Sequence, residues 1–298
     1  IRPMRIVSLL PSTTEIVFDL GLQDQLQGVT IECNWPQSAK SGREIVVDTF
    51  TNPTMTPGEI DAIVKQRMAA GLDLYNLDDD ALARCNPDLI LSQDLCRVCA
   101  VASGDVDAAV ARLNCNATVL QIDPQNLHQV IESINTIAVA AGVADRGIAL
   151  TESLHRRLEA VAMTVAGKKR PKVFVLEWTD PPFGAGHWVP DIITAAGGEP
   201  VLCRPGDRSV QTTWDEIAAA TPDVVIVAPC GFGLDGASEQ ARSVSEFLPT
   251  SVAVWAIDAD AVMVRPGPRL VDGVEAIAHM LHGDNVNNIN NELLRKIR

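Results

Sequence analysis

The sequence predicts an α/β protein built from two similar lobes that are joined by one long helix. The chain has 298 residues, a usual length for about two domains. Near its middle, residues 125–165 contain no proline and carry apolar residues at helical spacing. Gly142 interrupts this stretch, and Asp145 can cap the start of a second helix. We expect a helix of about four to five turns, then a longer one of about six.

The two flanks of this stretch share a pattern at a constant spacing. Pro87-Asp88 recurs as Pro222-Asp223, each time between a helix-like segment and an apolar strand. Ile122-Asp123, at the end of an apolar run, recurs as Ile257-Asp258. Both repeats are 135 residues apart, which indicates two similar α/β lobes. The alternative is that the succession of helix, Pro-Asp and strand is simply common in α/β chains.

The composition argues against several classes of function. The chain is 47% hydrophobic and 21% charged, so it can bury ordinary cores. Its net charge of −14 argues against binding nucleic acid or an anionic membrane surface, because both need basic patches. No apolar run approaches the roughly 20 residues of a membrane-spanning helix. We expect no nucleic-acid partner, no membrane span and a monomer.

The cysteines and the two ends of the chain suggest where the protein works. Seven cysteines, an odd number, lie mostly in apolar segments, which is typical of free thiols in a reducing compartment. No signal peptide precedes the first strand. We therefore expect a cytoplasmic location, with an extracytoplasmic one, periplasmic or lipid-anchored, as the alternative. Residues 284–298 are Asn-rich and then basic, so we expect a tail or an added segment outside the fold.

In the first lobe, apolar strands alternate with helices. We expect strands at residues 5–10, 29–31, 44–47, 72–77 and 89–92, and helices after Pro11, at residues 55–70 and before Pro87. Ser12 and Thr13 follow the first strand, where they either cap the next helix or face a ligand at the carboxyl edge of the sheet. Trp35 lies in a loop, where a large aromatic residue more often meets a ligand than fills a core. Tyr75 is the only tyrosine.

A Cys-x-x-Cys pair, Cys96 and Cys99, follows the last of these strands. A zinc site would need a second pair of ligands, and none stands at the usual spacing. A thiol redox pair would need a thioredoxin-like context, which is absent. We favour a turn at the ligand edge whose sulfur atoms pack or touch a ligand, and keep the other two interpretations open.

The second lobe opens with a buried strand at residues 172–176 and an unusual aromatic loop. Residues 177–188 hold Trp178, Phe183, His187 and Trp188, which a core does not need but an aromatic ligand site does. His187 is a candidate for a metal ligand, a capping residue or a hydrogen-bond donor. Further candidates follow later in the chain: Trp214 at a helix start, Phe232 in a Gly-rich loop, and Arg265 in a proline-rich loop that either presents a cation to an anionic group or is simply solvated.

These residues resemble the substrate-binding proteins of metal-chelate ABC importers, and among them the cobalamin-binding branch. The resemblance covers about residues 5–282. The segments that carry it are RIVSLLPSTTEIVFDLG, LDDDALARCNPDLIL, QDLCRVCAV, LEWTDPPFGAGHWVPDIITAAGG, TTWDEIAAATPDVVIV, PCGFG and RPGPRLVDG.

The resemblance implies an architecture and a docking mode. It implies two Rossmann-like α/β lobes (residues 1–143 and 170–283) joined by a single long rigid helix (144–169), with a ligand cleft between the lobes. It also implies that one acidic residue on each lobe docks on the membrane permease. The matching positions are Asp80 and Asp215, where the family usually has glutamate.

The implied function is non-enzymatic binding of a corrinoid (cobalamin) for uptake or salvage, with delivery to an ABC importer or an intracellular acceptor. No cofactor is required, because cobalamin is the ligand. Broad aromatic surfaces suit a corrin. Those surfaces would come from Trp35, Tyr75, Trp178, Phe183, Trp188 and Trp214, and His187, Cys96 or Cys99 would approach the cobalt. The alternatives are a haem or ferric-siderophore binder with the same fold, a thiol redox enzyme that uses Cys96 and Cys99, a metal-handling enzyme that uses His187, and a sensor that reports ligand to a partner.

Overall fold

The computed structural model describes residues 2–93, 103–283 and 290–298. Contacts divide the chain into two units. Unit 1 comprises the chain up to Asp123 together with Ile131–Thr151, and unit 2 comprises Pro124–Val130 together with the chain from Glu152 onward. The first residues of the helix Leu127–Ala140 thus belong to unit 2, whereas our sequence-based prediction assigned the whole helix to the first lobe.

Unit 1 is built on a six-stranded sheet in the order β4-β3-β2-β1-β5-β6. The strand pairs are parallel except that of β3 with β4, which is antiparallel. The strands are β1 (Ile6–Ser8), β2 (Leu26–Thr30), β3 (Glu44–Thr49), β4 (Tyr75–Leu77), β5 (Leu89–Ser92) and β6 (Thr118–Gln121). The helices are α1 (Pro11–Asp19), η1 (Gln23–Gln25), α2 (Pro57–Ala69), α3 (Asp79–Cys85) and α4 (Ser103–Arg112).

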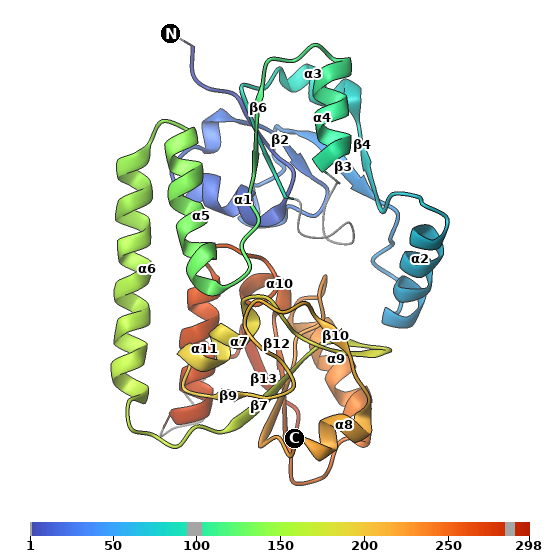
Figure 1. Cartoon of the computed structure of the whole chain (residues 1–298), viewed down its shortest axis with the longest axis vertical. Helices are drawn as coiled ribbons and strands as arrows, with labels where there is room; N and C mark the ends of the chain where they lie inside the picture. Colours follow the sequence, from blue (N-terminus) through green and yellow to red (C-terminus); the bar gives the residue numbers. More distant parts are fainter. Residues whose placement is uncertain (1, 94–102, 284–289) are drawn as a thin grey trace. The chain divides into compact units, whose positions relative to one another are not determined.

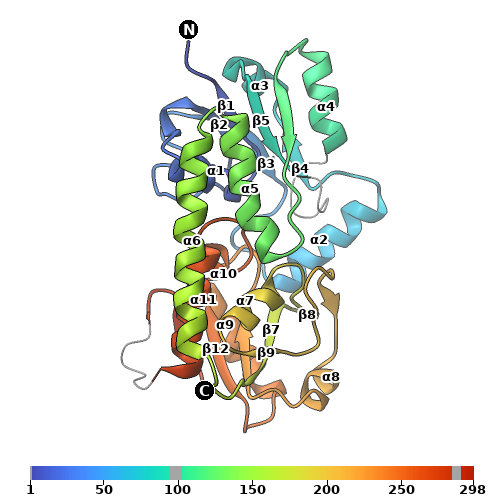
Figure 2. The same ribbon diagram turned by 60° about the vertical axis from the view of Figure 1, so that its left-hand side comes forward.

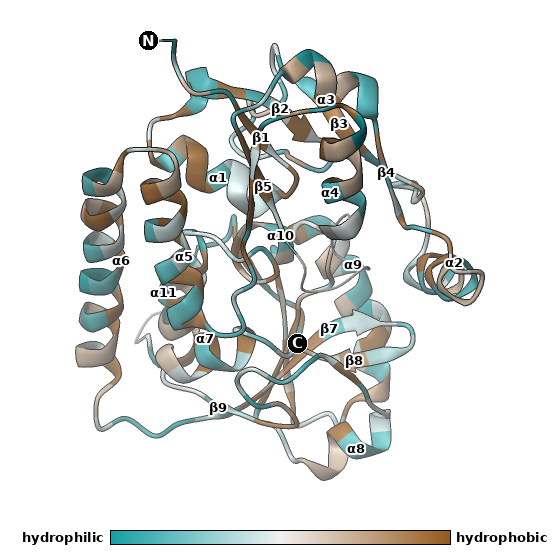
Figure 3. Ribbon diagram, turned by 45° about the horizontal axis from the view of Figure 1, so that its top comes forward, coloured by the Kyte–Doolittle hydropathy of each residue, from teal (hydrophilic) through white to brown (hydrophobic). Residues whose placement is uncertain are grey.

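The central strands of this sheet are buried on both faces, as their unbroken apolar sequence predicts. Ile6, Val7 and Ile90 are fully buried, and Figure 3 shows β1 and β5 in hydrophobic colours. Helix α2 differs, because none of its residues is buried. Figure 1 shows it standing off the sheet on the arm that joins β3 to β4.

The predicted cap of α1 is wrong. The helix begins at Pro11 with Leu10 at the N-cap position, and no side chain caps it. Proline suits the first helical position, because its missing N–H would have had no partner there. Ser12 and Thr13 instead lie inside the first turn, 3% and 0% exposed.

Unit 2 is built on a seven-stranded sheet in the order β10-β8-β7-β11-β12-β13, with β9 also paired to β7. Its strands are β7 (Lys172–Thr179), β8 (Pro182–Gly184), β9 (Glu199–Pro200), β10 (Val210–Gln211), β11 (Val224–Val227), β12 (Ala253–Ile257) and β13 (Leu294–Lys296). The helices are α7 (Val189–Ala195), α8 (Trp214–Ala219), α9 (Leu234–Val244), η2 (Ser245–Phe247), α10 (Ala259–Val262) and α11 (Leu270–His282). Strands β7, β11 and β12 are parallel neighbours and form the centre of the sheet.

Two helices connect the units: α5 (Leu127–Ala140) and α6 (Ala144–Val165). Helix α6 has 22 residues, so the predicted long helix is confirmed. It lies beside α5 (Figures 1 and 2), where Gly147 faces Ala138 so closely that a Cβ would stand 2.5 Å from it. Arg146 of α6 donates to the Leu20 carbonyl in unit 1, 3.0 Å away. Arg157 holds Glu275 of unit 2 through two hydrogen bonds of 2.8 and 2.6 Å. Each half of α6 is therefore tied to its own unit.

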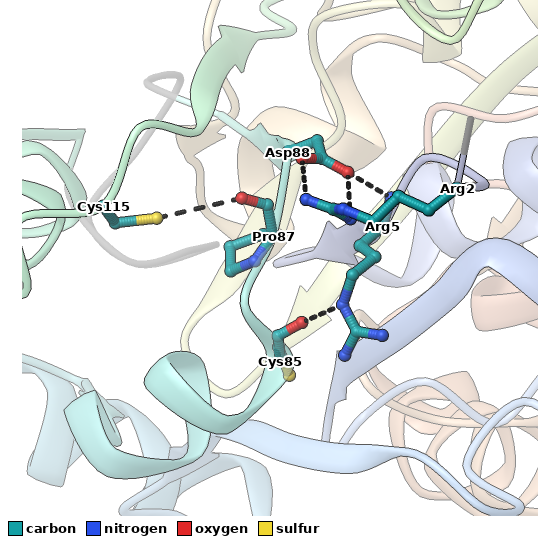
Figure 4. Close-up of polar contacts among 6 residues, drawn as sticks. All are labelled: Arg2, Arg5, Cys85, Pro87, Asp88 and Cys115. Atoms are coloured by element: carbon teal, nitrogen blue, oxygen red, sulfur yellow. Dashed lines mark hydrogen bonds and ion pairs between the residues drawn. The ribbon is translucent and has the colours of Figure 1, made fainter.

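The Pro-Asp motif makes the same connections in both units. In unit 1, the Asp88 carboxylate accepts the Arg5 backbone N–H at 2.8 Å (Figure 4). The Asp88 N–H in turn donates to the Arg5 carbonyl. In unit 2, Asp223 does the same with Lys172, at 2.8 and 2.9 Å. Asn86 and Thr221, each two positions before the aspartate, have left-handed backbones with φ angles of +43° and +50°. One motif thus ends a helix and fastens the start of the first strand, which supports the prediction of two similar lobes.

The prediction that the C-terminal segment lies outside the fold is wrong. Strand β13 pairs antiparallel with β12, with Leu294 opposite Ile257. Leu294 is fully buried, and Ile297 packs against the core of unit 2. The segment is mostly polar, so its few apolar positions did not indicate a strand in the sequence. They are sufficient for an edge strand, because β12 provides the backbone hydrogen bonds.

Candidate functional site

The carboxyl edge of the sheet in unit 2 gathers several of the predicted aromatic and charged residues. Because β7, β11 and β12 are adjacent and parallel, the segments that follow them leave the sheet at one edge. These segments begin at Asp180, Ala228 and Asp258. In parallel α/β sheets, ligands bind at this edge.

An aromatic pair occupies this edge. The rings of Trp178, at the end of β7, and Phe232, after β11, lie 6.2 Å apart and are tilted by 55°. Both side chains are half-buried. The Trp178 Nε1–H donates to the Asp180 carbonyl at 3.0 Å, which fixes the plane of the indole. Gly231 has a φ of +86°, so the turn that presents Phe232 favours glycine at that position. Tilted pairs at this distance are a favourable aromatic arrangement.

A half-buried carboxylate on α10, Asp260, connects this turn to Arg265 in the loop after α10. Asp260 accepts the Gly231 backbone N–H at 3.0 Å and lies 3.5 Å from the Arg265 guanidinium. Burial raises the pKa of the Asp260 carboxyl, while Arg265 acts in the opposite direction. The side chain of Arg265 is only 10% exposed, so it is not the solvated loop residue that was one of the two expectations. Asp260 itself was not singled out in the sequence.

The turn that carries His187 is held by a neighbouring loop. The His187 N–H donates to the Asp207 carbonyl at 2.6 Å, and the Gly206 N–H donates to the His187 carbonyl at 3.0 Å. His187 has a φ of +55°, and its half-buried ring meets Trp188 edge-on at 5.5 Å. Glu177 accepts a hydrogen bond from the Ser209 hydroxyl and thereby ties β7 to the same loop.

Two of the predicted tryptophans do not contribute to this edge. Trp188 is 7% exposed, and its Nε1–H donates to the Met263 carbonyl at 2.8 Å, so it is a core residue. Trp214 stacks on Phe247 at 5.2 Å and packs against the core. Phe247 belongs to η2, where the chain has already returned along α9 toward the amino end of β12. Trp214 therefore does not join Trp178 and Phe232. Phe183 lies on β8 directly opposite Trp178 and is half-buried.

In unit 1, the two predicted hydroxyl residues are buried beneath the edge of the sheet. Thr13 Oγ1 lies 2.7 Å from Ser8 Oγ, and Thr14 Oγ1 donates to the same Ser8 oxygen at 2.8 Å. The chain of contacts continues from Thr14 to the buried Cys33 sulfur at 3.1 Å. With Ser12 3% and Thr13 0% exposed, neither offers a surface to a ligand, so this part of the prediction is wrong. The buried hydroxyls of Ser8, Thr13 and Thr14 satisfy one another's hydrogen-bonding groups, as buried polar groups must.

The exposed aromatic residues of unit 1 lie at the carboxyl ends of β2 and β3. Trp35 is 49% exposed in the loop after β2. Tyr75 is half-buried and pairs with Thr49, the last residue of β3. Sequence reasoning missed Phe50, which is 45% exposed, and Arg67, whose guanidinium lies 3.6 Å above the centre of the Phe50 ring. Only the position of Phe50 at a strand end could have indicated it.

The two predicted docking residues occupy equivalent places. Asp80 and Asp215 are each the second residue of a helix, α3 and α8, and both are exposed. Each helix has a side-chain cap one residue before its start, Asp78 in one and Thr213 in the other. Acidic residues in a first helical turn are favoured by the helix dipole.

The remaining predicted site residues, Cys96 and Cys99, lie outside the described residues. Within the described ranges, no three His, Cys, Asp or Glu side chains gather into a metal-binding group. In the same part of the chain, no helix combines the length and apolar character needed to cross a bilayer.

Two parallel-stranded α/β units connected through long helices, with an aromatic and charged ligand edge, define the class of two-lobed ligand-binding proteins. The chain belongs to the periplasmic binding protein family, whose model matches residues 6–259. This confirms the predicted resemblance.

Individual relatives show what kinds of protein are similar to this chain. An uncharacterized ABC transporter substrate-binding lipoprotein of Bacillus subtilis, YvrC, is 25% identical over 297 residues, which cover 95% of this chain and 81% of the relative. The vitamin B12-binding protein of Vibrio cholerae is 20% identical over 281 residues, covering 93% of this chain and 88% of its own length. A periplasmic heme binding protein from Pseudomonas aeruginosa shares the fold, with a TM-score of 0.74, 18% identity, and coverage of 99% and 98%.

The prediction of a cytoplasmic location is wrong. The family is periplasmic, and the Bacillus subtilis relative is named a lipoprotein. The free cysteines were a poor indicator of the compartment, because two of them, Cys33 and Cys85, are buried at 1% exposure each. Burial raises the pKa of the Cys85 thiol to about 11. Such a thiol stays protonated and unreactive, so it does not require a reducing compartment.

Proposed function

We propose that this chain is the non-enzymatic substrate-binding component of an ABC importer and that its ligand is a corrinoid. The observation that carries the ligand class is the pair Trp178–Phe232 at the carboxyl edge of unit 2. A corrin has broad apolar faces and a rim of amide groups. Aromatic rings suit the faces, and a few fixed polar groups suit the rim. The similarity to vitamin B12-binding proteins supports the same choice.

The edge also holds polar groups of the kind that a corrinoid rim requires. The Asp260–Arg265 pair stands directly beneath the turn that presents Phe232, because Asp260 holds the Gly231 N–H. A carboxylate and a guanidinium together accept and donate hydrogen bonds, which matches an amide. No acid–base–nucleophile set is needed, and the ligand is carried without being changed.

Haem is the second candidate, and a specific observation favours it. The loop between α10 and α11 carries two arginines, Arg265 and Arg269, and haem has two carboxylates that arginine binds well. The fold is shared with a heme binding protein. Against haem, Arg265 is already paired with Asp260. A ferric siderophore remains a third candidate for the same fold.

His187 is the proposed axial ligand of the bound metal. A metal that is already held by four nitrogen atoms of a macrocycle takes only one or two further ligands, so a metal-binding cluster is not required. His187 is half-buried, and its backbone is fixed by Asp207 and Gly206. Its ring is therefore carried by a defined turn. Replacement by alanine is expected to abolish any ligand-induced shift in the visible spectrum while leaving most of the affinity.

Asp80 and Asp215 are the proposed docking residues for the permease. Each is exposed in the first turn of a capped helix, at the same place in its unit. Aspartate has a shorter side chain than the usual glutamate, so the partner arginines would have to approach more closely. Charge reversal at both positions should reduce transport in a reconstituted importer without changing ligand affinity.

The decisive experiment is a titration of the purified protein with hydroxocobalamin and, separately, with hemin. We expect saturable one-to-one binding of hydroxocobalamin by calorimetry and visible absorbance. Phe232→Ala should weaken binding by roughly 10- to 100-fold, because it removes half of the aromatic pair. Phe247→Ala is the matched control. Phe247 also pairs with a tryptophan, Trp214, but that pair does not lie at the ligand edge.

The outcomes separate the candidates. Binding of hemin but not hydroxocobalamin would replace the corrinoid by haem. Equal losses in both phenylalanine variants would refute the assignment of the ligand edge. Absence of binding to either compound, with the protein folded, would refute the proposed ligand class.

A further inference from the structure

The arm between β3 and β4 in unit 1 presents a cation on an exposed aromatic ring. Phe50 follows the last residue of β3 and is 45% exposed, although it is a large apolar residue. Arg67, in the last turn of α2, lies with its guanidinium 3.6 Å above the Phe50 ring centre. This distance is well within the range of a cation–π contact, and the flat guanidinium can also stack on the ring.

The geometry of Arg67 is fixed while part of its guanidinium stays available. Its Nε–H donates to the Asp73 carbonyl at 2.7 Å, at the far end of the arm. Within the described residues no carboxylate forms an ion pair with it, whereas Lys65 of the same helix pairs with Asp61 at 2.7 Å. The two terminal amino groups of Arg67 can therefore serve a ligand. An arginine fork of this kind suits a phosphate or a carboxylate.

The position of this pair agrees with a ligand-facing role. Phe50 donates its backbone N–H to the Leu74 carbonyl, beside Tyr75, so it lies at the carboxyl edge of the sheet of unit 1. Trp35, 49% exposed, leaves the same edge after the neighbouring parallel strand β2. The chain as a whole is acidic, with 38 Asp plus Glu against 24 Lys plus Arg. Arg67 therefore places a positive charge at this edge of a protein whose net charge is negative.

We infer that Arg67, stacked on Phe50, is a specificity subsite that binds an anionic substituent of the ligand. The inference rests on the proposed function, which supplies the ligand. The shared chemistry is a phosphate or carboxylate oxygen that accepts from the guanidinium. In a cobalamin it is the phosphate of the nucleotide loop, and in a haem it is a propionate.

Paired ligands test this subsite, because each pair differs in the anion. Cobinamide lacks the nucleotide loop and its phosphate, and the dimethyl ester of hemin lacks the two charges. For Arg67→Gln we expect affinity for hydroxocobalamin to fall about 5- to 20-fold, with affinity for dicyanocobinamide changed less than about twofold. If the ligand is haem, the same selective loss should appear for hemin and not for its dimethyl ester.

Two further variants separate recognition from structure. Lys65→Gln is the matched control, since it removes the same charge from α2 two residues away, on another face of the helix, and should leave all affinities unchanged. Phe50→Leu keeps Arg67 and an apolar side chain but removes the ring. It should lower affinity for the anionic member of the pair by about 2- to 5-fold. Circular dichroism and thermal unfolding verify that each variant is folded.

Each result decides one point. A loss confined to the anionic member of either pair supports the subsite and identifies the group that it binds. Equal loss for both members of a pair, or no loss, overturns the subsite and leaves the proposed function intact. If the wild-type protein binds none of the four compounds, the proposed function fails and the subsite fails with it.

Discussion

Gly186 precedes His187 at a place where the backbone of a second loop comes close. A Cβ atom added to Gly186 would stand 2.4 Å from the Asp207 carbonyl oxygen, 2.6 Å from the Arg208 carbonyl carbon and 2.7 Å from the Ser209 nitrogen. All three are backbone atoms, so no side chain can rotate out of the way. The substitution Gly186→Ala must therefore move one of two loops that are hydrogen-bonded to each other.

The expected cost follows from this geometry. Overpacking a well-filled region usually costs about 1–3 kcal/mol, and backbone contacts place this case at the upper end. Unit 2 has about 150 residues, for which each kcal/mol lowers Tm by roughly 2–4 °C. We expect Gly186→Ala to lower Tm by about 5 to 10 °C, measured by differential scanning calorimetry. The displaced turn should also weaken the spectral response that is assigned to His187.

Gly104 provides the control for this experiment. It lies in α4, and among the described residues an added Cβ there would meet no atom within 4 Å. Gly104→Ala should keep or slightly raise Tm, because alanine has less conformational freedom to lose on folding than glycine. A Tm for Gly186→Ala within about 1 °C of wild type would refute the argument. It would show that the loop after β9 yields without cost and does not hold His187 in place.

Three further predictions concern the motif and the thiols. Asp223→Ala should lower the free energy of unfolding in urea by about 1–2 kcal/mol, because it leaves a strand N–H without its acceptor; a cost below about 0.3 kcal/mol would contradict this. A backbone N–H, and next to it Arg2, lowers the pKa of Asp88 below its ordinary 3.8. The stability that Asp88 contributes is thus fully present above its ordinary pKa and is lost as the pH falls through its lower folded pKa. Asp88→Asn should therefore make the free energy of unfolding depend less on pH below about pH 4. Iodoacetamide should label the exposed Cys230 before Cys203, whose pKa burial raises to about 11; the reverse order by mass spectrometry would refute the assigned exposures.

Much of the fold was accessible from local sequence patterns. The long helix was predicted from its apolar period, and α6 spans Ala144–Val165. The helix predicted at residues 55–70 is α2, and Thr56 and Glu59 form a complete capping box at its start. The Pro-Asp repeat was predicted from spacing, and its two copies make the same backbone contacts. These features depend on residues that are near in sequence or on a motif that appears twice.

The prediction failed where a residue's role depends on distant partners. Trp188 was taken for a ligand surface, but Met263 accepts its indole N–H inside the core. Leu294 was assigned to a tail, but β12 pairs with it. The loop aromatics of such a chain look equivalent in sequence. Only packing distinguishes one that fills a core from one that lines an edge, because burial depends on which segments meet.

By itself, the sequence determined the α/β class, the long helix and the two copies of one motif, because periodicity, caps and turns act over a few residues. The tertiary structure decided which side chains share a ligand edge. Trp178 and Phe232 are brought together only because β7 and β11 are parallel neighbours. Arg67 meets Phe50 only because the arm after β3 folds back on its own start. Strand order and loop return are set by the burial of the whole sheet, and no local pattern encodes them.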